Sequence, residues 1–226
     1  TEISVADSAI VDHYKLIRES ADAYHIGNMH IELGRSANFS SHSMTLGGAI
    51  VSNDVNANLS GQGGECTLNG LYLVDHQRLV DNHTTIRHAS PHCTSHELYK
   101  GILADQARAV FNGKIIVALD AQKTDAKQTN KALLLSEDAQ INTKPELEIF
   151  ADDVKCTHGA TVGQLDDEAL FYLRSRGLSK EQSRNLLIHA FASDLLNRIR
   201  VEPIRVQLDS LLLQQLPGSG SGFFHD

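Results

Sequence analysis

Apolar and polar positions follow two different periods along the chain. Between residues 9 and 157, short runs of alternating apolar and polar residues are separated by small and polar residues, as in β-strands with one buried face. No amphipathic helix of convincing length interrupts them. The pattern predicts strands at residues 10–17, 24–33, 38–44, 49–59, 66–74, 79–88, 109–118, 123–135 and 140–150.

The turns between these predicted strands resemble one another. A polar residue is followed by a small one, and a new strand then begins, as in Asp7-Ser8-Ala9, Arg35-Ser36-Ala37, Asp105-Gln106-Ala107, Leu119-Asp120-Ala121 and Glu137-Asp138-Ala139. Many short strands with weakly repeated turns favour a solenoid of stacked β coils. Because the spacings are uneven, a β-sandwich or barrel remains the alternative.

The pattern becomes helical after Gly163. Asp166 is placed to cap a first helix, and Gly177 follows that helix as a C-terminal stop. Ser179 and Gln182 form a capping box for a second helix. Its predicted apolar face carries Leu187, Phe191, Leu195 and Ile199 at every fourth position, joined by Leu186, Ala190 and Leu196.

These patterns divide the chain into three regions. We predict a β region at residues 1–163, a helical region at 164–217 whose third helix covers 204–216, and a flexible Gly- and Ser-rich tail at 218–226. The helical region is too short to bury its apolar stripe alone. It is therefore expected to cap the open end of the β stack, to dock a partner, or to do both.

Composition narrows the class of protein. A net charge of -8 does not imply a nucleic-acid or acidic-membrane partner, and no apolar run approaches the ~20 residues that span a bilayer. The three cysteines are widely spaced and odd in number, which favours reduced thiols in the cytoplasm. The chain begins with Thr1 in the middle of a strand-like pattern, so we expect it to be a fragment of a longer protein.

The densest group of candidate metal ligands lies between residues 81 and 96. It holds His83, His88, His92, His96 and Cys93, and imidazole and thiolate are the ligands that zinc prefers. Their spacing matches no zinc-finger signature, and His83 and His88 fall on opposite faces of a regular strand. Polar side chains along the wall of a β coil are therefore the commoner explanation.

Signatures of common enzyme classes are absent from the sequence. There is no Walker A loop, no Gly-x-Ser-x-Gly elbow and no His-Glu-x-x-His pair. Asp152 and Asp153 could be paired carboxylates of a β-helical enzyme acting on polysaccharide, but adjacent strand residues point to opposite faces. We expect a non-enzymatic protein and keep that carbohydrate-active enzyme as a remote alternative.

Cys156 and His158 form the second candidate site. They lie two residues apart, so a strand through Thr157 would place both side chains on one face. A thiol beside an imidazole suits soft metals, sulfur chemistry and nucleophilic catalysis. The alternative is that Cys156 is a small buried residue and His158 part of the wall.

The surroundings of this pair are similar to a known family. Residues 152–166, which include Cys-Thr-His-Gly-Ala-Thr, and residues 171–177 closely resemble the C-terminal part of the SufD family. Shorter resemblances occur at 68–72, 81–84, 111–114 and 122–126, and the similarity extends from the first residues to about Ile199. SufD proteins are longer at the N-terminus, which agrees with the fragment interpretation.

The resemblance implies a fold and a function. SufD is a scaffold subunit of the SufBCD complex, which assembles iron-sulfur clusters. Its core is a right-handed parallel β-helix, which pairs with that of SufB. Its C-terminal helices dock SufC, the ATPase that binds ATP.

The resemblance also implies roles for particular residues. His158 is expected to be a ligand of the nascent cluster, with Cys156 beside or beneath it, and no cofactor is expected to stay on this chain alone. Contacts with the ATPase are expected from the helical region, at Asp166, Phe171, Tyr172, Arg174, Arg176, Leu187 and Phe191. Two alternatives remain open: a scaffold without metal contact, and self-pairing of the isolated chain through exposed strand edges.

Overall fold

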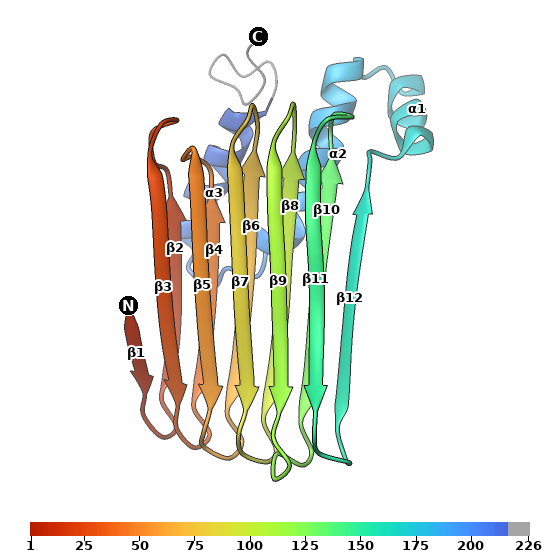
Figure 1. The fold of residues 1–226 in the computed structure, drawn as a ribbon. Helices are drawn as coiled ribbons and strands as arrows, with labels where there is room; N and C mark the ends of the chain where they lie inside the picture. The colour runs from red at the N-terminus through yellow and green to blue at the C-terminus, as the bar shows by residue number, and fades with distance from the viewer. Residues whose placement is uncertain (217–226) are drawn as a thin grey trace.

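The computed structural model describes residues 1–216, in which two parallel six-stranded sheets are followed by three helices (Figure 1). The first sheet, sheet A, contains β1 (Glu2–Val5), β3 (Tyr24–Leu33), β5 (Ile50–Leu59), β7 (Leu79–His88), β9 (Arg108–Val117) and β11 (Gln140–Ile149) in that order. The second, sheet B, contains β2 (Ile10–Ile17), β4 (Asn38–Thr45), β6 (Glu65–Val74), β8 (Thr94–Leu103), β10 (Asp125–Leu134) and β12 (Lys155–Gly163). The predicted tail, 218–226, lies outside the described residues.

Consecutive strands alternate between the two sheets. Each strand pairs in parallel with the strand two places along the chain, so the chain winds into stacked coils. The predicted parallel β-solenoid is therefore confirmed. The sandwich and barrel alternatives are wrong, because they would pair neighbouring strands of the chain with each other.

Strand β8 was absent from the predicted strands. The residues just before β8 are rich in His, Ser and Pro, and two charged residues, Glu97 and Lys100, interrupt the apolar pattern of the strand. In the structure both charged residues are 3% exposed, Glu97 inside the solenoid and Lys100 against the helices. The prediction failed because each charge is buried against a partner that lies far away in the sequence.

One row of corners is held by a ladder of backbone hydrogen bonds. The corner residues Ser8, Ser36, Gly63, His92 and Lys123 all have positive φ, a conformation that costs non-glycine residues free energy. Each corner amide donates to a carbonyl oxygen at the corresponding corner of the next coil, over 2.7–3.1 Å. This repeated hydrogen bond helps to offset the cost of the strained corners.

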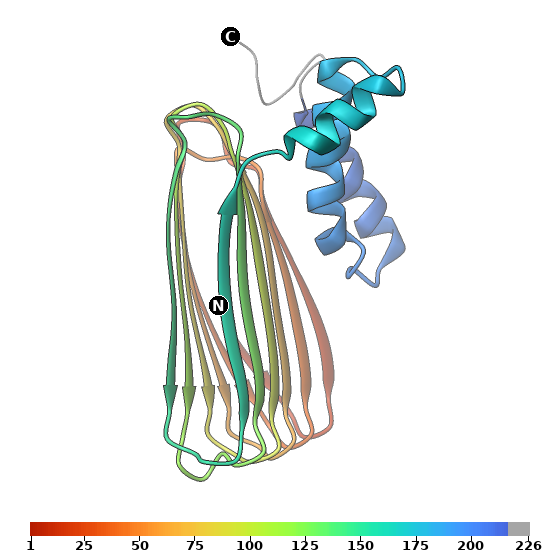
Figure 2. The same cartoon turned by 90° about the vertical axis from the view of Figure 1, so that its right-hand side faces the viewer.

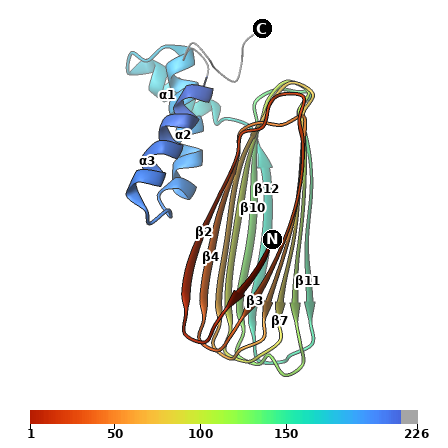
Figure 3. The same ribbon diagram turned by 90° about the vertical axis from the view of Figure 1, so that its left-hand side faces the viewer.

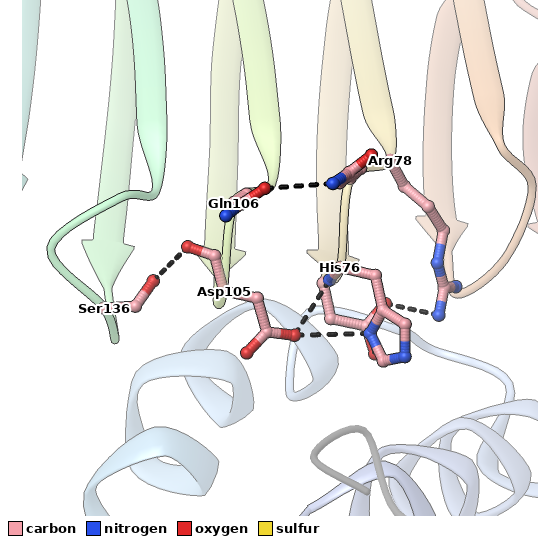
Figure 4. Close-up of polar contacts among 7 residues, drawn as sticks. His76, Arg78, Asp105, Gln106 and Ser136 are labelled. Carbon is pink, nitrogen blue, oxygen red and sulfur yellow. Dashed lines mark hydrogen bonds and ion pairs between the residues drawn. The ribbon is translucent and has the colours of Figure 1, made fainter. Parts of the chain in front are cut away.

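Side chains also connect the turns at the opposite edge of the solenoid (Figure 4). The backbone N–H of His76 donates to Asp105 Oδ2 over 2.9 Å, and His76 Nδ1 lies 3.2 Å from the same oxygen. Gln77 Nε2 donates to Gln106 Oε1 over 3.0 Å. Ser136 Oγ donates to the Asp105 carbonyl over 2.6 Å. These contacts tie three consecutive coils together along this edge.

Two tyrosines and two glycines pack reciprocally inside the solenoid. Gly70 is in register with Tyr99, and Tyr72 with Gly101, on the adjacent strands β6 and β8. A Cβ atom added at Gly70 or at Gly101 would lie 2.3 Å from the ring of the facing tyrosine. Glycine therefore makes the room that each buried ring occupies.

The three helices lie beside the outer face of sheet B (Figures 2 and 3). They are α1 (Asp167–Ser175), α2 (Lys180–Leu196) and α3 (Glu202–Gln215). The predicted Asp166 cap, the Ser179–Gln182 capping box and the positive φ of Gly177 are all present. Within residues 1–216, no helix is both long and apolar enough to cross a membrane.

The helices do not cap the open end of the β stack, so that expectation is wrong. Apolar residues of α2 and α3 instead form one buried cluster with apolar residues on the outer face of sheet B. The cluster includes Met44, Leu71, Leu73, Leu98, Ile102 and Leu133 from the sheet and Ile188, Ala192, Leu195, Leu196, Leu208, Leu211 and Leu212 from the helices. These outward-facing apolar side chains account for the position of the helices.

The buried face of α2 also differs from the predicted one. Leu195, Leu196 and Ile199 are buried as expected, whereas Leu186 is 47% exposed and Ala190 is exposed. Ile188, Ala192 and Ser183 are buried in addition. The apolar residues of α2 span more than one stripe, and contact with sheet B selects which stripe is covered.

Replacing Gly70 with Ala should destabilise the solenoid by about 1–3 kcal/mol, because the new methyl group would overlap the Tyr99 ring. Gly163→Ala is the matched control, since an added Cβ there meets no atom within 4 Å. Urea denaturation of both variants measures the difference. Equal stability of the two variants would contradict the packing described for Gly70.

Candidate functional site

The last coil of the solenoid leaves two strand edges open. Within the described residues, β12 pairs only with β10, and β11 pairs only with β9. Apolar side chains at this end are partly exposed, among them Ile149, Phe150 and Val162. Unpaired parallel edges with exposed apolar residues can add a strand from another chain.

Cys156 and His158 lie on this terminal strand. They are in register with Ala126 and Gln128, both buried, so their side chains share the face that continues the interior of the solenoid. The predicted common face is therefore confirmed. Cys156 is half-buried against the core, whereas His158 is exposed.

The two side chains are therefore presented differently. Burial raises the pKa of the Cys156 thiol, which a hydrogen bond involving the Ala126 backbone partly counters. A raised thiol pKa disfavours the thiolate, the form that attacks or binds metal. In this structure the accessible ligand atoms are therefore those of the His158 imidazole.

The backbone of β12 also faces outward at these residues. The Lys155 amide donates to the Thr124 carbonyl oxygen of the preceding coil. In a parallel pair, the N–H and C=O groups of alternate residues point to opposite sides. The backbone N–H and C=O groups of Cys156 and His158 therefore point toward the open edge of β12.

A buried polar pair lies one and two coils behind His158. Gln128 Nε2 donates to Glu97 Oε2 over 2.6 Å, and both side chains are buried. Burial raises the pKa of Glu97 to about 7, and the hydrogen bond from Gln128 reduces that shift. The sequence reasoning missed Glu97. The long gap between the predicted strands at 79–88 and 109–118 was the signal that could have revealed its strand.

The histidine-rich segment does not form one site. His83 is exposed beside Asp81, and His88 is buried, where burial lowers its pKa to about 4 and Nε2 lies 2.8 Å from Ser95 Oγ. His92 occupies a corner and His96 is exposed on β8. Among residues 1–216, no group of three or more His, Cys, Asp or Glu side chains is arranged to hold a metal ion.

Helix α1 exposes the aromatic residues expected to meet a partner. It has no buried residue, with Phe171 75% and Tyr172 57% exposed. The guanidinium carbon of Arg176 lies 5.0 Å from the Tyr172 ring centroid, and Arg174 is exposed. Asp166 is engaged differently, because its carboxylate caps α1 by accepting from the amides of Glu168 and Ala169.

The other two expected contact residues lie on α2. Leu187 is half-buried, and the Phe191 ring centroid lies 4.8 Å from Lys100 Nζ. Lys100 Nζ also donates to the Phe191 carbonyl over 2.8 Å and pairs with Asp194 over 2.7 Å. Phe191 therefore helps to hold α2 on β8, which the sequence pattern did not reveal.

Helices α2 and α3 are joined by a hydrogen-bonded group that the sequence analysis did not single out. His189 Nε2 lies 2.8 Å from Asp209 Oδ1, and His189 Nδ1 lies 3.2 Å from Ser193 Oγ. The combination resembles a Ser-His-Asp triad in composition. However, the Ser193 hydroxyl donates to the His189 carbonyl over 2.6 Å, so its proton is directed away from the imidazole. The group therefore links the helices.

Comparison with known proteins identifies the family. A family model described as SUF system FeS cluster assembly, SufBD core domain, matches residues 1–191. The chain belongs to the SufBD core family. This confirms the resemblance on which the SufD-type interpretation rests.

Several SufBD relatives cover most of this chain. Iron-sulfur cluster assembly protein SufD of Escherichia coli is 41% identical over 96% of the chain and 51% of its own length. A SufBD family protein of Synechocystis is 38% identical over 92% of the chain and 46% of its own length. Protein ABCI7, chloroplastic, of Arabidopsis thaliana is 32% identical over 91% of the chain and 44% of its own length. The chain thus spans about half the length of the curated relatives it matches.

Glu97→Gln should change how the stability of this SufBD chain depends on pH. The native Glu97 carboxyl holds its proton to about pH 7, whereas the unfolded chain releases it near 4.5. The free energy of unfolding contributed by this group should therefore fall by up to about 3 kcal/mol as pH rises through that window. Glutamine does not titrate and can still accept from Gln128.

Denaturation of both chains between pH 4 and pH 8 tests this expectation. Their difference in stability isolates Glu97 from the histidines, which titrate in both. The variant should gain stability relative to the wild type as pH increases. A constant difference across the range would show that Glu97 ionises alike in the folded and unfolded chains.

Proposed function

We propose that this chain is part of a non-catalytic scaffold subunit of a SufBCD-type complex, in which iron-sulfur clusters are assembled. The observation that carries the proposal is the exposed imidazole of His158 on a terminal strand whose outer edge is unpaired, with the Cys156 thiol on the same face. Imidazole and thiolate are both ligands of iron in cluster sites. The SufBD family match and the names of its relatives, which refer to iron-sulfur cluster assembly, support this function.

A SufB-type solenoid is the proposed partner at the open edges of β11 and β12. Strand addition there would satisfy the outward backbone groups of β12 and cover the exposed apolar residues at this end. It would also bring the partner's thiolates to His158, while Cys156 supports the site from beneath. In the absence of that partner, a second copy of this chain could occupy the same edges.

A SufC-type ATPase is the proposed partner of the helical region. Phe171 and Tyr172 form an exposed aromatic pair, and Arg174 and Arg176 add positive charge beside it. The ATPase would supply nucleotide binding, since this sequence has no Walker A loop. Attachment of α2 to β8 through Lys100 allows ATPase movement to reach the solenoid as a rigid-body displacement.

The three cysteines agree with a reducing cytoplasmic setting. Cys66, Cys93 and Cys156 are all free, and the first two are buried in the solenoid. Free buried thiols persist most readily where glutathione and thioredoxin keep them reduced. We therefore place the scaffold in the cytoplasm.

His158→Ala should lower cluster assembly at least about tenfold in a complex reconstituted with SufB- and SufC-type partners, since the imidazole nitrogen is lost. Binding of the ATPase should not change. His96→Ala is the matched control, because His96 is exposed on the same sheet but lies two strands away from the open edge. If the His158→Ala variant assembles clusters normally, the remaining interpretation is a scaffold without metal contact.

The double substitution Phe171→Ala/Tyr172→Ala should weaken binding of the SufC-type ATPase at least about tenfold, as expected for exposed aromatic anchors. Val206→Ala/Leu213→Ala is the control, because both residues are partly exposed on α3. Calorimetric titration of the ATPase into each chain measures the affinity. A larger loss of affinity in the control variant would indicate that the ATPase docks on α3 instead.

A further inference from the structure

A column of inward-facing side chains, all polar except Leu68, leads in register to His158. The parallel pairing aligns one inward-facing residue from each strand of sheet B. From the N-terminal coil to the open edge, these residues are His13, Ser41, Leu68, Glu97, Gln128 and His158. His158 is therefore the exposed final member of a column whose two preceding members are buried and hydrogen-bonded.

The Gln128 amide is held in one place. Its Nε2 donates to Glu97 Oε2 over 2.6 Å, and a Cβ atom added at Gly113 would lie only 2.3 Å from the same nitrogen. Glycine at position 113 thus makes room for the amide from the facing sheet. Above about pH 7, where Glu97 is ionised, its carboxylate can only accept hydrogen bonds, so the amide must turn its NH₂ group toward it.

This orientation leaves the amide oxygen without a donor. Within residues 1–216, Gln128 Oε1 is buried and has no hydrogen-bond partner. A buried acceptor that lacks a donor is costly and is uncommon in folded proteins. Because the NH₂ group faces Glu97, the oxygen points away from that carboxylate, and His158 is the next residue of the column.

The imidazole of His158 is a suitable donor. Among the described residues its ring makes no hydrogen bond and is exposed, so it is free to turn toward Gln128. Histidines that bind metal usually donate their other ring N–H to a carboxylate or carbonyl oxygen, which fixes the tautomer. A clamped amide carbonyl one coil behind an exposed histidine meets that requirement.

We propose that Gln128, clamped by Glu97, is a positioning residue for His158: its side-chain oxygen accepts one imidazole N–H and leaves the other ring nitrogen unprotonated for the metal. The inference rests on the proposed function, in which His158 contacts iron. Neither Gln128 nor Glu97 touches the metal. Their role is to select the tautomer and the direction of the ring.

Nitrogen NMR of the intact chain, labelled with ¹⁵N-histidine, tests the tautomer without any cluster. At a pH well above the titration of free imidazole, the two ring-nitrogen shifts of His158 report which nitrogen carries the proton. The His158→Ala spectrum assigns the signals. The wild type should show one predominant tautomer, and Gln128→Met should show a changed ratio, because methionine offers no comparable acceptor.

Further variants make the test specific. Glu97→Leu should change the ratio as Gln128→Met does, whereas Glu97→Gln should preserve it, because its amide oxygen can still accept from Gln128. Asn130→Leu is the matched control. It removes another buried amide of β10, one that donates to Thr143 Oγ1 over 2.7 Å and is in register with Ala160 instead of His158. Gln128→Leu replaces Gln128→Met if that variant does not fold.

Cluster assembly separates this inference from the proposed function. Gln128→Met should slow assembly about tenfold in the reconstituted complex, as expected for loss of a residue that orients a ligand. Unchanged His158 nitrogen shifts in Gln128→Met, or an equal change in Asn130→Leu, would overturn the positioning role. Normal assembly by His158→Ala would overturn the ligand role, whatever the nitrogen shifts show.

Discussion

In-register pairing of parallel strands is the constraint on which the rest of this structure depends. Each strand hydrogen-bonds to the strand of the next coil, so every inward side chain has its register partner as a neighbour. The buried ring of Tyr99, for example, fits because its register partner is Gly70. Similarly, a polar residue needs a polar partner nearby. Lys15 Nζ donates to Asn53 Oδ1 over 2.7 Å, and Asn53 Nδ2 donates to Asn82 Oδ1 over 3.2 Å.

The same constraint explains why the candidate chemistry lies at an end. Interior coils satisfy their backbone groups on both sides, and their side chains are covered by the coils above and below. The terminal strand β12 has only one partner, so a side chain on its inner face is both aligned with the core column and accessible. His158 thus combines an ordered support with exposure, which a histidine in an interior coil such as His88 does not have.

Strand β8 connects this interior to the helices. Glu97 lies on its inner face within the column that leads to His158, and Lys100, three residues later, binds α2 on the outer face. Both charges are buried and both have partners from other elements. A displacement of α2 would therefore act on β8, the same strand whose Glu97 accepts the hydrogen bond from Gln128.

The sequence by itself favoured the solenoid over a sandwich or barrel, and it determined the helices and the shared face of Cys156 and His158. These features follow from local signals: alternation of apolar residues, small residues at turns, helix caps and a two-residue spacing on a strand. The face of α2 that is buried was not determined locally, because Leu186 and Ile188 are both apolar and only contact with sheet B distinguishes them.

The tertiary structure also decided the positions of β8, the helices and Gln128. The charges of Glu97 and Lys100 concealed a strand, because their partners Gln128 and Asp194 are distant in the sequence. The helices lie on sheet B instead of the open end, because apolar residues on its outer face receive them. Register places Gln128 behind His158, and the two residues lie on different coils, so only the pairing of β10 with β12 brings them together.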